Sequence, residues 1–97
     1  MHATPEQSQA WLRARMAELG VSSLDELAKR CGSDKGNLSR IFRQLQSPRV
    51  DVLEPMAAGL GVGVYELLVR IGVVDPDVDT PPAVSRNGQT VTFMWPE

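Results

Sequence analysis

The sequence predicts a mainly α-helical fold of five short helices, followed by a C-terminal β-hairpin or strand. Three observations carry this prediction: helix-capping residues precede apolar segments, glycines follow such segments, and one Asn-Gly pair lies between β-prone residues near the C-terminus. The 97 residues suit a single small domain, and the content of 42% hydrophobic and 23% charged residues is ordinary for a folded chain.

The first helix is predicted to begin after Thr4 and to end at Gly20. Thr4 can cap the helix, Pro5 suits its first position, and Gln7 can complete a capping box. Its apolar side chains are Trp11, Leu12, Met16 and Leu19. Gly20 then ends the helix, because glycine readily adopts the left-handed conformation that is common there.

Two shorter helices are predicted next, separated by a break at Gly32. Ser23 can cap the second helix, with Glu26 three residues further on, and Asp34 can cap the third. Helical spacing gives both an apolar face toward the core. The second helix carries Leu24, Leu27, Ala28 and Cys31 on this face, and the third carries Leu38, Ile41, Phe42 and Leu45.

The fourth and fifth helices are predicted to end at Gly61 and Gly72. The fourth follows a turn around Pro48, and its apolar set is Val50, Leu53, Met56, Ala57 and Leu60. Pro55 has no backbone N–H donor, so it either kinks this helix or falls in the first turn of a helix that starts late. The fifth helix is predicted over residues 64–71.

The composition changes after the fifth helix. Residues 73–82 are acidic and proline-rich, which is typical of an extended linker. In residues 83–97, Asn87-Gly88 is a favoured two-residue hairpin turn. A lone hairpin is marginally stable in water, so this β tail is expected to pack on the helices or to pair with a second copy.

The charge is distributed unevenly along the chain. The net charge is −2, yet residues 1–50 carry eight basic against five acidic side chains, and residues 51–97 carry two against seven. Binding responds to the local field, so the basic half allows a nucleic-acid partner. No apolar run is long enough to cross a bilayer, and the first residues are no signal peptide, so we expect a cytoplasmic protein without a membrane partner.

Residues 28–40, with the sequence AKRCGSDKGNLSR, have the spacing of a helix-turn-helix unit. Ala28 allows two helices to approach closely, Gly32 provides the turn, and Leu38 directs the third helix toward the core. Helical periodicity then turns the other residues outward or sideways: Lys35, Gly36, Asn37, Ser39, Arg40 and Arg43. This thin, basic helix has a size that the major groove of DNA admits.

The helix order, with the segments LAKRCGSDKGNLSRIFR and SPRVDVLEPMAAGLGVGVYELL, resembles the bacteriophage Cro and repressor family of helix-turn-helix domains. The resemblance covers about residues 5–72 and implies a repressor-like five-helix bundle over residues 4–72. It places Lys35, Gly36 and Arg40 at base-reading positions in the major groove, where Lys35 and Arg40 suit guanine O6 and N7. It also implies contacts with the DNA backbone for Ser23, Asn37, Arg43, Gln44 and Arg49.

Two positions depart from the family pattern. Leu24 stands where many members have a Gln that contacts phosphate, and Ser23 could substitute for that contact. Phe42 stands where many members have a Glu paired with an Arg of the first helix. We expect Phe42 to pack on Met16 instead of forming an ion pair.

These features predict a sequence-specific DNA-binding transcriptional regulator, similar to a small phage Cro or repressor protein, that binds a near-palindromic operator as a homodimer. The C-terminal tail is the candidate dimerisation element through Val91, Phe93 and Trp95, unless it packs on its own domain. A different class of function stays open, namely an antitoxin-like interaction module whose aromatic tail binds a partner protein.

Catalysis is not expected, because an enzyme needs a nucleophile, an acid–base group and oxyanion donors in one place. The single histidine, His2, lies at the chain end, and the lone Cys31 falls on an apolar helix face. Asp75, Asp77 and Asp79 alternate but lack the glycine and the glutamate of a calcium loop. No metal site, cofactor or small-molecule ligand is therefore expected.

Overall fold

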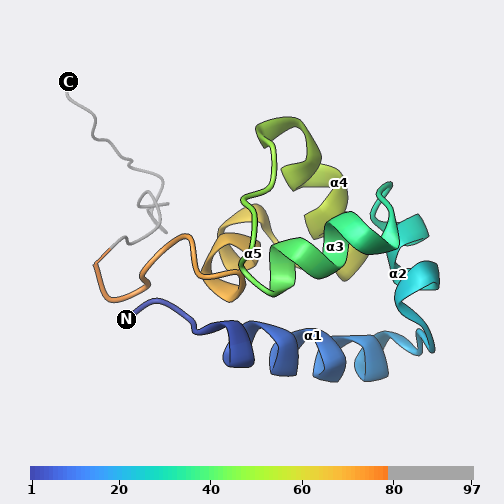
Figure 1. Cartoon of the computed structure of the whole chain (residues 1–97), viewed down its shortest axis with the longest axis horizontal. Coiled ribbons are helices and arrows are strands. Elements are labelled where there is room, and N and C mark those ends of the chain that lie inside the picture. Colours follow the sequence, from blue (N-terminus) through green and yellow to red (C-terminus); the bar gives the residue numbers. More distant parts are fainter. Residues whose placement is uncertain (79–97) are drawn as a thin grey trace, which may run out of the picture.

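The computed structural model describes residues 1–78, which form five helices (Figure 1). The helices are α1 (Pro5–Leu19), α2 (Leu24–Arg30), α3 (Lys35–Phe42), α4 (Val50–Leu60) and α5 (Val64–Arg70). The prediction of a mainly α-helical fold with five helices is thus confirmed. The predicted hairpin, in residues 83–97, lies outside the described residues.

Side-chain caps begin the first three helices at the residues that the sequence predicts. The Thr4 hydroxyl accepts a hydrogen bond from the Gln7 backbone N–H at 3.1 Å, and Gln7 Oε1 accepts one from the Thr4 N–H at 2.9 Å. Ser23 and Asp34 cap α2 and α3 with their own side-chain oxygens. These caps satisfy N–H groups that have no partner inside the helix, so local signals determine where each helix starts.

Four helix ends carry the predicted glycines. Gly20, Gly32, Gly61 and Gly72 all have positive φ angles, from 67° to 82°. Most side chains are strained in this left-handed region, which explains why glycine occupies these positions. The end of α3 differs, because Gln44 adopts a φ of 60° there.

Two residues that were predicted to belong to apolar helix faces are exposed instead. Leu45 is 62% exposed, because α3 already ends at Phe42 and the left-handed Gln44 turns the chain away from the helix. Val50 is 85% exposed and occupies the first position of α4. Since α4 starts there and continues through Pro55, the alternative of a late helix start is wrong.

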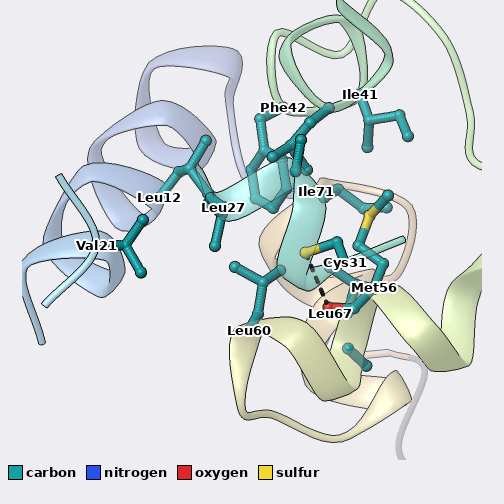
Figure 2. Close-up of a cluster of buried hydrophobic side chains, with 13 residues drawn as sticks. Leu12, Val21, Leu27, Cys31, Ile41, Phe42, Met56, Leu60, Leu67 and Ile71 are labelled. Atoms are coloured by element: carbon teal, nitrogen blue, oxygen red, sulfur yellow. Dashed lines mark hydrogen bonds between the residues drawn. The ribbon is translucent and has the colours of Figure 1, made fainter. Parts of the chain in front are cut away.

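All five helices contribute to one hydrophobic core (Figure 2). α1 runs along one side of the bundle and packs against α3, α4 and α5, whereas α2 packs against α3 and α4 (Figure 1). The buried apolar residues are Leu12, Val21, Leu27, Ala28, Cys31, Leu38, Ile41, Phe42, Met56, Ala57, Leu60, Leu67 and Ile71. Because α2 and α3 bury their inner faces in this shared core, the other helices determine how the pair is oriented.

In residues 1–78 no single helix is long and apolar enough to span a membrane. α4 and α5 satisfy the requirement for length and composition only as a pair, and the two helices are bent by 94° relative to each other.

Candidate nucleic-acid interface

The pair α2–α3 folds as a helix-turn-helix. Cys31 caps the end of α2, and Gly32 makes the turn with a φ of 67°. The Ser33 N–H donates to the Ala28 carbonyl at 2.9 Å, which closes the chain over the last turn of α2. Ala28 and Leu38 are only 2% and 0% exposed, so both predicted inward positions are confirmed.

α3 presents its basic side chains to solvent. Lys35 and Arg40 are exposed, as is Arg43 at the C-terminal cap, and the helix itself contains no acidic residue. Lys35 Nζ lies 3.9 Å from Asp25 Oδ2, with the two side chains 59% and 68% exposed. Such a surface pair is weak, so it leaves Lys35 available to a stronger anion.

A chain of side-chain hydrogen bonds, here called the α3 polar chain, runs along this surface through Ser33, Asn37, Gln46 and Arg40. Arg40 Nε donates to Gln46 Oε1 at 2.9 Å, and Gln46 Nε2 donates to Asn37 Oδ1. Asn37 Nδ2 donates in turn to Ser33 Oγ at 2.9 Å. Gln46 was not among the predicted site residues, because it lies beyond α3 and no helical spacing links it to Arg40.

Gly36 lies beneath the side chain of Arg40. A Cβ atom at Gly36 would lie 3.3 Å from Arg40 Nη1 and 3.3 Å from Asp34 Oδ1. Both distances are shorter than ordinary contacts of a Cβ atom, so any side chain at this position would displace the guanidinium or the capping carboxylate. The structure thus brings two predicted base-reading positions together. Arg40 carries the N–H donors, and Gly36 leaves the space that the Arg40 guanidinium occupies.

Two of the predicted DNA-backbone residues besides Arg43 are exposed, namely Ser23 and Arg49. The Ser23 oxygen accepts from the Glu26 N–H at 3.1 Å, which leaves the hydroxyl proton for another acceptor. Arg49 pairs with Asp51 at 3.3 Å, and the two side chains are 83% and 67% exposed. A phosphate can therefore compete with this carboxylate for Arg49.

Gln44 is the predicted DNA-backbone residue whose side chain points into the domain. Its Nε2 donates to the Ala3 carbonyl at 2.8 Å and to Ser8 Oγ at 2.9 Å. Ser8 is 0% exposed, and its hydroxyl donates to the Arg70 carbonyl. Both N–H donors of the Gln44 amide are thus occupied within the domain, where they tie the loop after α3 to α1.

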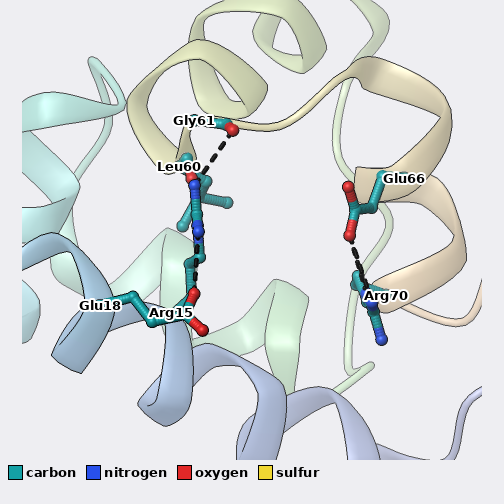
Figure 3. Close-up of polar contacts among 6 residues, drawn as sticks. All are labelled: Arg15, Glu18, Leu60, Gly61, Glu66 and Arg70. Atoms are coloured by element: carbon teal, nitrogen blue, oxygen red, sulfur yellow. Dashed lines mark hydrogen bonds and ion pairs between the residues drawn. The ribbon is translucent and has the colours of Figure 1, made fainter.

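Two arginines of the basic half serve the packing of helices. Arg15 in α1 donates to the carbonyl oxygens of Leu60 and Gly61 at 2.7 and 3.1 Å (Figure 3). Arg30 donates from Nε to the Gly59 carbonyl at 3.1 Å. Cations at the carbonyl end of a helix satisfy its last acceptors and complement its dipole, so these two charges stabilise α4.

The acidic residues after α5 lie near the start of the chain. Asp75 and Asp77 both pair with the N-terminal ammonium of Met1. The hydrogen bond from this ammonium holds the pKa of the Asp75 carboxyl below its usual value. Within residues 1–78, no group of three or more His, Cys, Asp or Glu side chains could hold a metal ion.

The fold and the exposed basic α3 define a helix-turn-helix domain of the kind that binds DNA. The helix-turn-helix family of the Cro/C1 type matches residues 12–67, and the chain belongs to this family. A hypothetical transcription factor from Neisseria meningitidis serogroup B (strain ATCC BAA-335 / MC58) is 34% identical over 70 residues. That match covers 68% of this chain and 66% of the Neisseria protein, just under two thirds of its length. No solved structure matches the chain significantly.

Proposed function

We propose that this protein is a sequence-specific transcriptional regulator, of the small phage Cro or repressor kind, that acts by occupying operator DNA. The observation that carries the proposal is the exposure of Lys35 and Arg40 on the second helix of a helix-turn-helix. Membership of the family supports DNA binding, and the similar Neisseria protein bears the name of a transcription factor.

In the proposed complex, α3 enters the major groove and reads bases with its first two turns. Lys35 and Arg40 donate to guanine O6 and N7, and Arg40 can use two N–H groups for one guanine. Gly36 has no side-chain donor, so its proposed contribution to base reading is the space that it leaves for the Arg40 guanidinium at the helix start.

The residues around α3 are proposed to contact phosphates. Ser23 donates its hydroxyl proton, Arg43 and Arg49 donate from their guanidinium groups, and Asn37 donates the N–H that Ser33 does not use. Such contacts position the domain on the duplex without reading sequence. Gln44 supports this surface from inside, because its donors hold the loop against α1.

Selection of binding sites from random duplex DNA tests the proposal. The expected result is one consensus with two inverted half-sites, whose centres lie about one helical turn apart, roughly 34 Å. Guanine is expected at the positions that Lys35 and Arg40 contact. Equal affinity for all sequences would show that the protein is not a sequence-specific regulator.

Two arginine variants separate base reading from phosphate contact. Arg40→Ala is expected to cost roughly 1–3 kcal/mol at the selected site and to relax the preference at one base pair. Arg49→Ala is expected to weaken binding to all sequences alike and to reduce the slope of log K against log salt by about 1. An equal loss on all sequences for Arg40→Ala would make Arg40 a phosphate contact instead.

We propose that two copies bind the operator with two-fold symmetry, because one domain of this size makes few contacts with DNA. The candidate dimerisation element remains the tail of residues 83–97, with Val91, Phe93 and Trp95, beyond the described residues. Deletion of residues 83–97 should yield a monomer by light scattering and weaken binding to the full operator. A dimer that survives the deletion would exclude this role for the tail.

A further inference from the structure

We infer that Gln46 is a positioning residue that holds the Arg40 guanidinium ready to read one guanine. Gln46 would thereby determine base preference at that position without contacting a base itself. This inference rests on the proposed function of α3 and extends the specificity-determining surface to the loop between α3 and α4.

The two hydrogen bonds of Gln46 allow only one orientation of its amide. Its oxygen faces the Arg40 Nε–H, and its nitrogen faces Asn37 Oδ1. If the amide were reversed, its NH₂ group would face the Arg40 donor, and its oxygen would face the Asn37 acceptor. Because Asn37 is itself held by Ser33 Oγ, the α3 polar chain runs in one direction, with Arg40 as its first donor.

The bond to Gln46 engages a guanidinium donor that bidentate recognition of a guanine by the two Nη groups does not need. It uses Nε–H, at 2.9 Å from the Gln46 oxygen. Nη1 and Nη2 keep their N–H donors, and a pair of these matches guanine O6 and N7. Gln46 thus constrains the plane of the guanidinium and leaves the N–H donors of Nη1 and Nη2 for DNA.

Gly36 provides the space that this arrangement requires. The Arg40 guanidinium lies over the first turn of α3, where a Cβ at Gly36 would be 3.3 Å from Nη1. The side chain is therefore placed by the open surface of Gly36 beneath it and by Gln46 beyond it. The hydrogen bond to Gln46 and the absence of a side chain at Gly36 together determine where the Arg40 guanidinium lies.

Holding Arg40 in place before DNA arrives changes both affinity and specificity. Arginine has many rotamers, and immobilising such a side chain at an interface opposes binding. A guanidinium already held in place loses less conformational entropy when the complex forms. Because it is held in one position, it also rejects base pairs that lack two acceptors at that position.

A double-mutant cycle tests the inference in the full-length protein. The selected operator is titrated with four proteins: the parent, Arg40→Ala, Gln46→Leu and the double variant. Each is also titrated onto an operator altered at the base pair whose preference Arg40→Ala relaxes. Gln46→Leu is expected to lower affinity for the selected operator about two- to tenfold and to reduce discrimination at that base pair. In the Arg40→Ala background the same substitution should change neither quantity.

The controls separate positioning from other roles. Ser47→Ala alters the next exposed residue of the loop and should leave affinity and discrimination unchanged. Discrimination at one base pair is the readout that a merely structural role of Gln46 would not change. An unchanged Gln46→Leu variant, or an equal loss in the Arg40→Ala background, would overturn the inference while leaving the proposed function intact. A parent protein that selects no DNA sequence would overturn the proposed function itself, and this inference with it.

Discussion

The ring of Trp11 in α1 stacks on the ring of Phe42 in α3, with centroids 6.1 Å apart and ring planes 9° from parallel. The Arg70 guanidinium of α5 lies over the same Trp11 ring, with Cζ 5.4 Å from the centroid. Phe42 is the last residue of α3 and is 1% exposed, so the stack fixes this end of α3 against α1. The sequence predicts that Met16 packs on Phe42. Both line one hollow between α1 and α3, but the ring partner of Phe42 is Trp11.

Phe42→Ala is expected to lower the free energy of unfolding by about 3–5 kcal/mol, because it removes a fully buried ring and its stacking contact with Trp11. Phe42→Glu should be at least as destabilising, since it places a carboxylate in an apolar site. Urea unfolding followed by circular dichroism measures both effects. Leu45→Ala is the control, and this exposed site should change by no more than about 0.5 kcal/mol. A Phe42→Glu variant as stable as the parent would refute the packing role of Phe42.

Gly59→Ala is expected to separate α2 from α4. An added Cβ would lie 2.6 Å from the Arg30 carbonyl oxygen and 2.8 Å from Cys31 Cα, which are backbone atoms. We expect the free energy of unfolding to fall by about 3 kcal/mol, although alanine is favoured over glycine inside helices by about 1 kcal/mol. Gly63→Ala is the matched control, because nothing lies within 4 Å of its Cβ position. The free energy of unfolding of Gly63→Ala should fall by less than about 1 kcal/mol. Similar urea midpoints for Gly59→Ala and Gly63→Ala would contradict a close contact between α2 and α4.

Ser8→Ala is expected to destabilise the domain by about 1–3 kcal/mol, because the half-buried Arg70 carbonyl loses its donor and one N–H of the Gln44 amide loses its acceptor. The Ser8 hydroxyl donates to the Arg70 carbonyl and accepts from Gln44 Nε2, and Ser8 itself is 0% exposed. Thermal unfolding by calorimetry measures the loss. Ser47→Ala, at an exposed serine, should leave the midpoint unchanged. If Ser8→Ala unfolded at the parent's temperature, the hydrogen bonds of Ser8 would contribute no net stability.

The stability of the domain is expected to fall at alkaline pH partly through Cys31. Burial raises the pKa of the Cys31 thiol above its ordinary value of 9.0, and the charge of Arg30 lowers this pKa by a smaller amount. The unfolded chain therefore loses the thiol proton first. The contribution of Cys31 is complete below about pH 9.0 and is lost as pH rises through the folded pKa.

Urea unfolding at pH 7.5 and at pH 10 compares the parent with Cys31→Ala. The parent should lose more stability between the two pH values than the variant does, because only the parent titrates at this position. The thiol should also react slowly with iodoacetamide in the folded protein and quickly in urea. Equal alkaline losses for parent and variant would contradict the effect of burial on Cys31.

The starts and ends of the helices could be predicted from the sequence because their signals are local. A capping oxygen reaches an N–H three residues away, as Thr4, Ser23 and Asp34 do. A glycine after an apolar helical segment indicates a left-handed φ angle that ends the helix, as at Gly20 and Gly32. The outward basic face of α3 follows from the same reasoning, since the helical period alone relates Lys35 and Arg40 to the buried Leu38.

The structure differs from the sequence-based predictions where the outcome depends on contacts between distant segments. Leu45 fits the apolar spacing of α3, but the left-handed turn at Gln44 ends the helix before it. The Gln44 amide donates to the Ala3 carbonyl and to Ser8 Oγ, two partners that no helical spacing relates to Gln44. No pattern in the chain indicates such partners, because side-chain pairing across a core depends on where the backbone has already been placed.

The sequence by itself determined that residues 1–78 form five short helices and that the third carries exposed cations, since both follow from interactions within a few residues along the chain. Only the tertiary structure decided that Trp11 supports Phe42 and that Gln46 holds Arg40. The physical reason is that ring stacking and hydrogen bonds require atoms within a few ångströms. That proximity arises only after packing brings α1 and the α3–α4 loop against α3.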